Sequence, residues 1–123
     1  MKKLILLIAF LSSAASAQCL STVSGTLSSD ITDTTSTQVI PAASGYRNDL
    51  KKVIVTNSSA TGTVVKIMDG STVKVRQYAT PGGGFVFDLG DRFIKGSTNT
   101  AWNIQAETTA TALQATFIAC KNY

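Results

Sequence analysis

Apolar and polar residues alternate along most of the chain in short stretches separated by Gly, Pro, Asn, Asp and Ser. A period of two is expected for strands with one buried face, and turn residues at such spacing are typical of a β-sandwich or barrel. The abundant Thr and Val are stiff at χ1 and suit a pleated surface. The pattern predicts strands at Thr35–Ile40, Lys51–Asn57, Gly62–Met68, Ser71–Tyr78, Phe85–Leu89, Ala101–Glu107 and Ala112–Cys120.

These strands predict an all-β protein with one domain, residues 35–123. We expect a single antiparallel β-sandwich, jelly-roll-like or immunoglobulin-like, of about seven or eight strands. Residues 18–34 are polar and low in complexity, which predicts an N-terminal arm or an edge strand. The sequence shows no internal repeat and no second domain.

One hairpin is predicted in detail around Asp69-Gly70, a dipeptide that favours tight turns between strands. A three-residue loop, Met68-Asp69-Gly70, would place Val65 opposite Val73. It would also gather the apolar side chains on one face, which a loop one residue shorter would not. Gly70 is then expected in the left-handed conformation.

The first 17 residues have the pattern of a secretory signal peptide. Lys2 and Lys3 precede an unbroken apolar run, Leu4 to Leu11, and Ala15-Ser16-Ala17 fits the cleavage rule. The run is far shorter than the roughly 20 residues that span a bilayer as a helix. The alternative is an N-terminal helix retained in the working protein.

Cleavage after Ala17 would leave 106 of the 123 residues and lower the net charge from +4 to +2, because Lys2 and Lys3 are removed. A charge this small gives no reason to expect nucleic acid or an anionic membrane as a partner. Contact with a membrane is expected only through the signal segment, if it is not cleaved. Lys66, Lys74 and Arg76 are predicted to line one face of the hairpin, either as a solvated surface or as an anion-binding one.

The two cysteines, Cys19 and Cys120, are predicted to form a disulfide, since an even count behind an export signal favours pairing. The alternatives are free buried thiols or a bridge between two chains. Such a disulfide would close a loop of about 100 residues, contribute up to about 4.7 kcal/mol in the chain-entropy model, and bring the chain ends together.

Catalytic groups are scarce in this sequence. The chain has no histidine, which excludes Ser-His-Asp and Cys-His mechanisms and leaves no reasonable zinc site. Asp88 and Asp91 form a close carboxylate pair and are best explained as turn residues, with a calcium site as the alternative. We therefore expect no enzyme activity, no cofactor and no bound metal.

Candidate contact residues cluster around an unusual loop, Pro81-Gly82-Gly83-Gly84. Three consecutive glycines permit close approach of another backbone, although a plain hairpin loop would explain them too. Phe85 follows the loop and shares a strand face with Phe87. Trp102 alternates with Ile104, so it is either an exposed contact or a core residue. The candidate binding or assembly residues are Tyr78, Gly82, Gly83, Gly84, Phe85 and Trp102.

Three stretches of the chain resemble small virion structural proteins of tailed phages. They are Val55 to Val73 (VTNSSATGTVVKIMDGSTV), Pro81 to Phe85 (PGGGF) and Asn99 to Gln105 (NTAWNIQ), within a resemblance covering roughly residues 38–118. This resemblance implies a compact β-sandwich that serves as a capsid decoration or head-fibre module.

Two features depart from that family, the export signal and the terminal cysteines. Because capsids assemble in the reducing cytoplasm, these features imply either a phage-like module secreted by a bacterium or a virion component that meets a membrane. The expected location is therefore the periplasm, the cell exterior, the cell surface or the virion surface.

The function expected from the sequence is a non-catalytic structural or assembly protein, self-assembling through strand addition by its N-terminal arm. The expected partners are further copies of the chain, or another virion or surface protein. The alternative is a secreted carbohydrate- or surface-binding module that uses Trp102 and Tyr78 as stacking platforms.

Overall fold

The computed structural model describes residues 19–109 and 112–123 and contains eight strands and no helix in that part. The predicted signal peptide, residues 1–17, lies outside the described residues. No helix of the described part is long and apolar enough to cross a membrane. The strands are β1 (Ser21–Thr26), β2 (Thr37–Ile40), β3 (Arg47–Asn57), β4 (Thr63–Asp69), β5 (Thr72–Ala79), β6 (Gly83–Asp88), β7 (Trp102–Ala106) and β8 (Leu113–Asn122).

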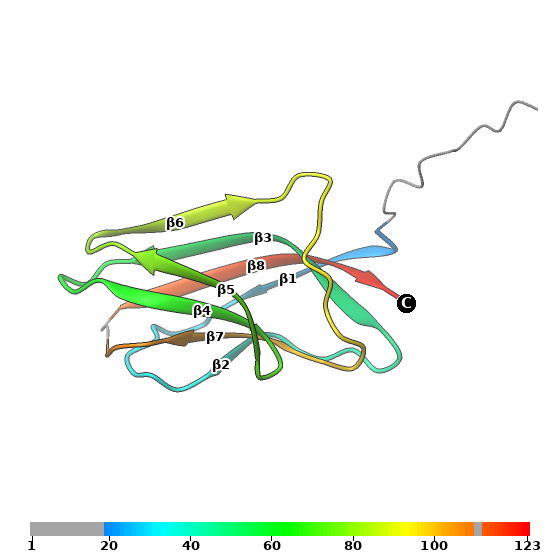
Figure 1. The fold of residues 1–123 in the computed structure, drawn as a ribbon, viewed down its shortest axis with the longest axis horizontal. Coiled ribbons are helices and arrows are strands. Elements are labelled where there is room, and N and C mark those ends of the chain that lie inside the picture. Colours follow the sequence, from blue (N-terminus) through cyan, green and yellow to red (C-terminus); the bar gives the residue numbers. More distant parts are fainter. Residues whose placement is uncertain (1–18, 110–111) are drawn as a thin grey trace, which may run out of the picture.

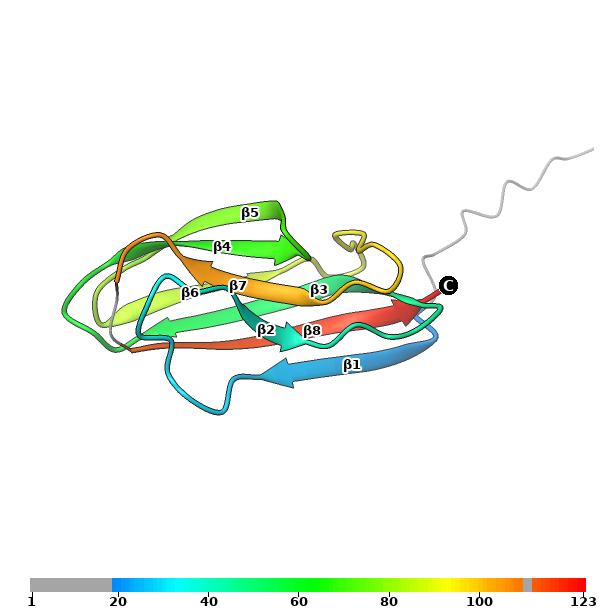
Figure 2. The same ribbon diagram turned by 90° about the horizontal axis from the view of Figure 1, so that it is seen from below.

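The strands form two antiparallel sheets of four, which confirms the predicted all-β sandwich (Figures 1 and 2). The first sheet has the order β1-β8-β3-β6, and the second has the order β2-β7-β4-β5. Strands pair from the chain ends inward: β1 with β8, β2 with β7, β3 with β6 and β4 with β5. This nested order is that of a jelly roll, so the topology decides between the two predicted sandwich types.

The core lies between the sheets and is built from alternate residues of each strand. Val53 and Val55 of β3 face Val65 and Ile67 of β4, and Phe117 of β8 is fully buried. All five are at most 1% exposed, as expected for side chains two residues apart on one face of a strand.

β3 begins four residues earlier than predicted, at Arg47, because a bulge interrupts the alternation. Leu50 pairs with Ala119 and Lys52 with Ile118, which leaves Lys51 as the extra residue. An extra residue in one strand shifts all later side chains by one position, which hides the strand from a period-two search.

The predicted register of the β4–β5 hairpin is wrong, although its turn glycine is confirmed. Gly70 has φ of +61°, the left-handed conformation. The loop, however, consists of two residues, Gly70 and Ser71, since Asp69 pairs with Thr72, and a bulge follows between Ile67 and Met68. Val73 therefore lies opposite Met68 instead of Val65 and is 42% exposed. The bulge shifts which residues of β5 lie opposite the apolar residues of β4, and nothing in the composition of the two strands indicates it.

The segment 18–34 supplies an edge strand to its own sheet. β1 pairs with β8 from Ser21↔Lys121 to Thr26↔Thr116, and Ile31 forms a further bridge with Leu113. A free arm that completes the sheet of a neighbour is thus not what the structure shows for this segment, because its hydrogen bonds are made within the chain.

The sandwich closes where β1 and β2 come together at Gly25, along the lower edge in Figure 2. Gly25 allows this closure, since a Cβ atom built on it would lie 2.0 Å from the carbonyl oxygen of Val39. No side chain fits at that distance, so the residue type at position 25 sets how closely the two sheets approach.

The first and last described segments of the chain meet at one end of the sandwich and are joined there by the predicted disulfide. Cys19 and Cys120 are bonded with a Cα–Cα distance of 5.0 Å. Beneath them, the buried carboxylate of Asp49 accepts hydrogen bonds from Arg47 Nε at 3.0 Å, Asn122 Nδ2 at 2.8 Å and the Gly96 amide at 3.0 Å. These bonds fix β8 and the loop after β6 to the start of β3. A disulfide is compatible with an exported protein.

Candidate functional site

The side of the sandwich formed by β5 and β6 is open. The two strands leave the short turn at residues 80–82 and diverge, as Figure 1 shows. Within the described chain, β5 pairs only with β4 and β6 only with β3, so both are sheet edges. Between them lies a groove of about 340 Å³, lined by Val75, Gln77, Phe85, Val86 and Phe87.

The groove is apolar and rests on fixed side chains. Phe85 and Phe87 are half-buried and pack against the core, so they form its floor. Val86 points the other way, toward the outer face of the first sheet, where it lies opposite Ile54 and is 62% exposed. Gln77 supplies the one polar side chain of the lining. An apolar surface of this kind suits contact with another protein.

The triple-glycine segment shapes this side by its contacts with the same chain. Gly82 occupies the turn with φ of +65°, and Gly83 begins β6. Gly84 has φ of +135°, and a Cβ atom on it would lie 2.0 Å from the carbonyl oxygen of Val55. The close backbone approach that glycine permits is therefore made to β3 of the same chain.

Tyr78 is exposed, at 51%, and lies over Gly62. A Cβ atom on Gly62 would be 2.0 Å from the Tyr78 hydroxyl oxygen, so the glycine leaves room for the phenol ring. Tyr78 does not line the groove. It occupies the same strand as Val75 and Gln77, which places it beside the open side.

Trp102 is not a surface contact, which corrects its assignment as a candidate binding residue. Its side chain is 0% exposed, and its Nε1 donates a hydrogen bond of 2.6 Å to the carbonyl oxygen of Asn48. A buried indole needs such an acceptor, and here β3 provides it. Trp102 and Ile104 are two residues apart, so they share one face of β7, and that face points into the core, where both are fully buried.

The predicted basic face of the hairpin carries ion pairs. Lys66 and Arg76 lie opposite each other, and both contact Glu107, with 3.6 Å between Lys66 Nζ and Glu107 Oε1. Exposed pairs of this kind contribute little stability. They keep the outer face of the second sheet hydrated, in contrast to the apolar edge at β6.

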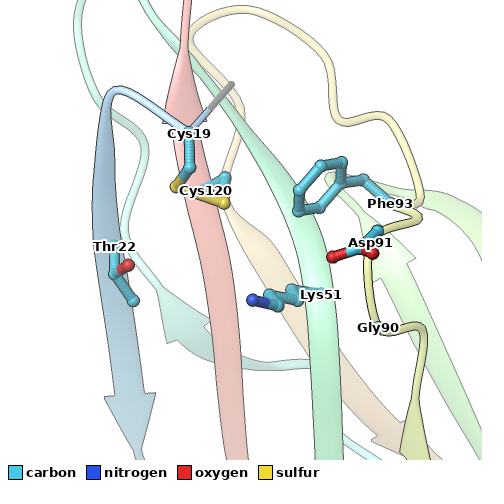
Figure 3. A pocket seen from close by; sticks show the side chains of 7 residues that line it. All are labelled: Cys19, Thr22, Lys51, Gly90, Asp91, Phe93 and Cys120. Atoms are coloured by element: carbon cyan, nitrogen blue, oxygen red, sulfur yellow. A yellow bond between two sulfur atoms is a disulfide. The ribbon is translucent and has the colours of Figure 1, made fainter. Parts of the chain in front are cut away.

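A second concavity, of about 240 Å³, lies beside the disulfide (Figure 3). It is lined by Cys19, Thr22, Lys51, Gly90, Asp91, Phe93 and Cys120. The bulge at Lys51 aims its amine into this space, and Asp91 and Phe93 border it from the loop after β6. The residues come from four separate segments, so no local pattern in the sequence could have revealed the site.

Asp88 behaves as the predicted turn residue. Its Oδ1 accepts a hydrogen bond of 2.9 Å from the Gly90 amide, and its Oδ2 lies 3.5 Å from Lys52 Nζ. The Gly90 amide, followed by the Lys52 charge, holds the pKa of Asp88 below its ordinary value. Among the described residues, no group of three or more acidic, cysteine or histidine side chains gathers as a metal site.

In the structure, Phe85 and the glycine loop lie together at the open side, and Tyr78 lies beside them. Trp102 is buried in the core. Sequence reasoning missed Val75, Gln77 and Val86. The signal that could have found Val86 is the three-residue apolar run Phe85-Val86-Phe87, which is unusual in an edge strand.

Comparison with known proteins adds no family to this geometry. No protein-family model matches the sequence, and no curated protein matches it. The resemblance to phage virion proteins stays a prediction.

Proposed function

We propose that this chain is a non-catalytic assembly module that associates with further copies of itself through its open side. The observation that carries the proposal is the groove between the unpaired edges of β5 and β6, with Val86 62% exposed at its rim. Sheet edges of soluble proteins are usually covered, charged or twisted away, because an exposed apolar edge invites pairing with another chain.

The chemistry of the groove also favours binding over reaction. Its lining consists of four apolar residues and one amide side chain, without an acid, a base or a nucleophile. Jelly rolls serve as capsid and lectin domains, both of which work by contact. The resemblance to phage decoration or head-fibre proteins agrees with this role and would place the module on a virion or a cell surface.

The alternative, a carbohydrate- or surface-binding module, has lost part of its support. It relied on Trp102 and Tyr78 as stacking platforms, and Trp102 is fully buried. Tyr78 alone offers one exposed ring, so self-assembly is the better-supported function.

Size-exclusion chromatography with multi-angle light scattering tests the proposal. The protein from Gln18 to Tyr123, with its disulfide formed, is measured over a hundredfold range of concentration at physiological salt. We expect the weight-average mass to rise above that of one chain toward a defined oligomer. A mass that stays at one chain over the whole range would contradict self-assembly.

A further inference from the structure

We propose that two copies pair through β6, antiparallel and centred on Val86, so that their first sheets join into one continuous sheet. This inference rests on the proposed function and names its contact. The order of the joined sheet would be β1-β8-β3-β6 in one copy followed by β6-β3-β8-β1 in the other.

The backbone of β6 is oriented for this pairing. The Leu89 amide donates a hydrogen bond of 3.0 Å to the Lys51 carbonyl of β3, next to the pair Lys52↔Asp88. Antiparallel pairs alternate between hydrogen-bonded and non-hydrogen-bonded, so Phe87 and Phe85 also direct their backbone groups toward β3. Val86 and Asp88 then direct theirs away from β3, toward the open side. Val86 of one copy can exchange both backbone hydrogen bonds with Val86 of the other.

Charge favours self-pairing at β6 and opposes it at β5. In a pairing centred on Val86, Asp88 of one copy lies opposite Gly84 of the other, so no like charges meet. A similar pairing of β5 centred on Val75 would set Lys74 against Arg76, which is destabilising. Edges that carry lysine or arginine are protected in this way.

The other two edges are also less available. β1 is approached by β2 on the closed side, where Gly25 meets the carbonyl of Val39. β2 has four residues, an irregular register between Gln38 and Ile40, and Pro41 directly after it. Short strands, bulges and proline all discourage edge pairing. β6 is therefore the unprotected edge of the described chain.

The side chains of β6 are self-complementary in the same register. Val86 meets Val86 of the second copy on the outer face, extending the apolar surface that begins at Ile54. On the groove face, Phe85 lies opposite Phe87 of the second copy, and the reverse pair forms across the two-fold axis. Aromatic pairs across strands stabilise sheets. The two phenylalanine pairs would extend over the grooves of both copies. This contact accounts for the apolar lining of each groove.

The symmetry of this contact fixes its stoichiometry. Each copy uses the same strand, so the interface is isologous and closes at two copies. The inference therefore predicts a dimer, and any larger assembly would need a second surface.

Cross-linking at the two-fold axis tests the register. The described cysteines are both in the disulfide, so the thiol of a Val86→Cys variant would be the reactive one. Hydrogen-bonded antiparallel partners lie about 5.5 Å apart at Cα, within the range that a disulfide bridges. We expect oxidised V86C to form covalent dimers joined at position 86, at least about tenfold faster than V73C, the matched control on β5. Equal rates in the two variants would overturn the inference.

A charge substitution separates the two proposals. Val86→Lys sets two ammonium groups against each other at the axis, whereas Val73→Lys places the charge at another exposed valine. We expect the apparent dissociation constant from light scattering to rise at least about tenfold for V86K and to change less than about twofold for V73K. Unchanged melting temperatures would show that both variants fold. If V86K associates like the unaltered protein, the β6 contact is wrong while assembly stands; a monomeric unaltered protein overturns both.

Discussion

Trp102 and Val86 are both apolar residues in alternating stretches, but the first is buried in the core and the second is exposed. Trp102 lies in β7, between β2 and β4, and its indole donates to a carbonyl of the facing sheet. Val86 lies in an edge strand and remains 62% exposed. From the sequence, Trp102 was either an exposed contact or a core residue. The face on which each side chain lies decides its use, because Trp102 points into the core and Val86 points to the outer face of its sheet.

The burial of Trp102 gives a prediction at the residue scale. Trp102→Ala should lower the free energy of unfolding by about 3–5 kcal/mol, because it removes a large core side chain. Trp102→Phe should cost less, since it keeps an aromatic ring and mainly leaves the Asn48 carbonyl without its donor. Urea unfolding followed by circular dichroism measures both. An Ala variant as stable as the unaltered protein would show that the indole does not belong to the core.

At the scale of elements, the two sides of the sandwich differ because of one glycine and one divergent pair of strands. On the closed side, Gly25 lets β1 lie against the backbone of β2. On the open side, β5 and β6 separate after their turn and leave the groove.

A side chain at position 25 should push β1 and β2 apart. Gly25→Ala places a methyl group 2.0 Å from the Val39 carbonyl oxygen, so β1 or β2 must move. Overpacking of this kind typically costs about 1–3 kcal/mol. Ser24→Ala, an exposed neighbour on the same strand, is the control and should stay within about 0.5 kcal/mol. Thermal unfolding gives the comparison, and equal stability of the two variants would show that the approach of β1 to β2 is loose.

At the scale of the whole molecule, the disulfide and the hydrogen bonds of Asp49 hold Cys19 and the end of β8 together at one end of the sandwich. Cys19 precedes β1, and Cys120 lies in β8, the partner of β1. The bond therefore secures an edge strand whose side chains are mostly exposed. The core between the sheets does not depend on it, since its buried residues come from β2 to β5, from β7 and β8, and from Ile31.

Removing the disulfide should weaken the fold without abolishing it. A Cys19→Ser, Cys120→Ser double variant should lose about 2–4 kcal/mol, less than the chain-entropy limit of about 4.7 kcal/mol, because engineered and native bridges often contribute less than that model gives. Hydrogen exchange should quicken first at the β1 amides, which lose their covalent anchor. Uniform loss of protection over β3, β4 and β7 would instead show that the bond supports the core.

The sequence by itself determined the local features of this protein. Alternation placed seven strands in order, turn chemistry identified the left-handed Gly70, and cysteine count identified the Cys19–Cys120 pair. The strands and the turn depend on residues that are neighbours in sequence, and two cysteines allow one pairing within the chain. Periodicity and composition are therefore enough to predict these features.

Only the tertiary structure decided which strands became neighbours and which edges stayed free. The bulges at Lys51 and after Ile67 moved the register without a local signal, and the burial of Trp102 depended on a carbonyl 54 residues away. The groove lies between β5 and β6 because β5 pairs with β4 in one sheet and β6 pairs with β3 in the other. Such features arise from pairing between distant segments, which a one-dimensional pattern does not contain.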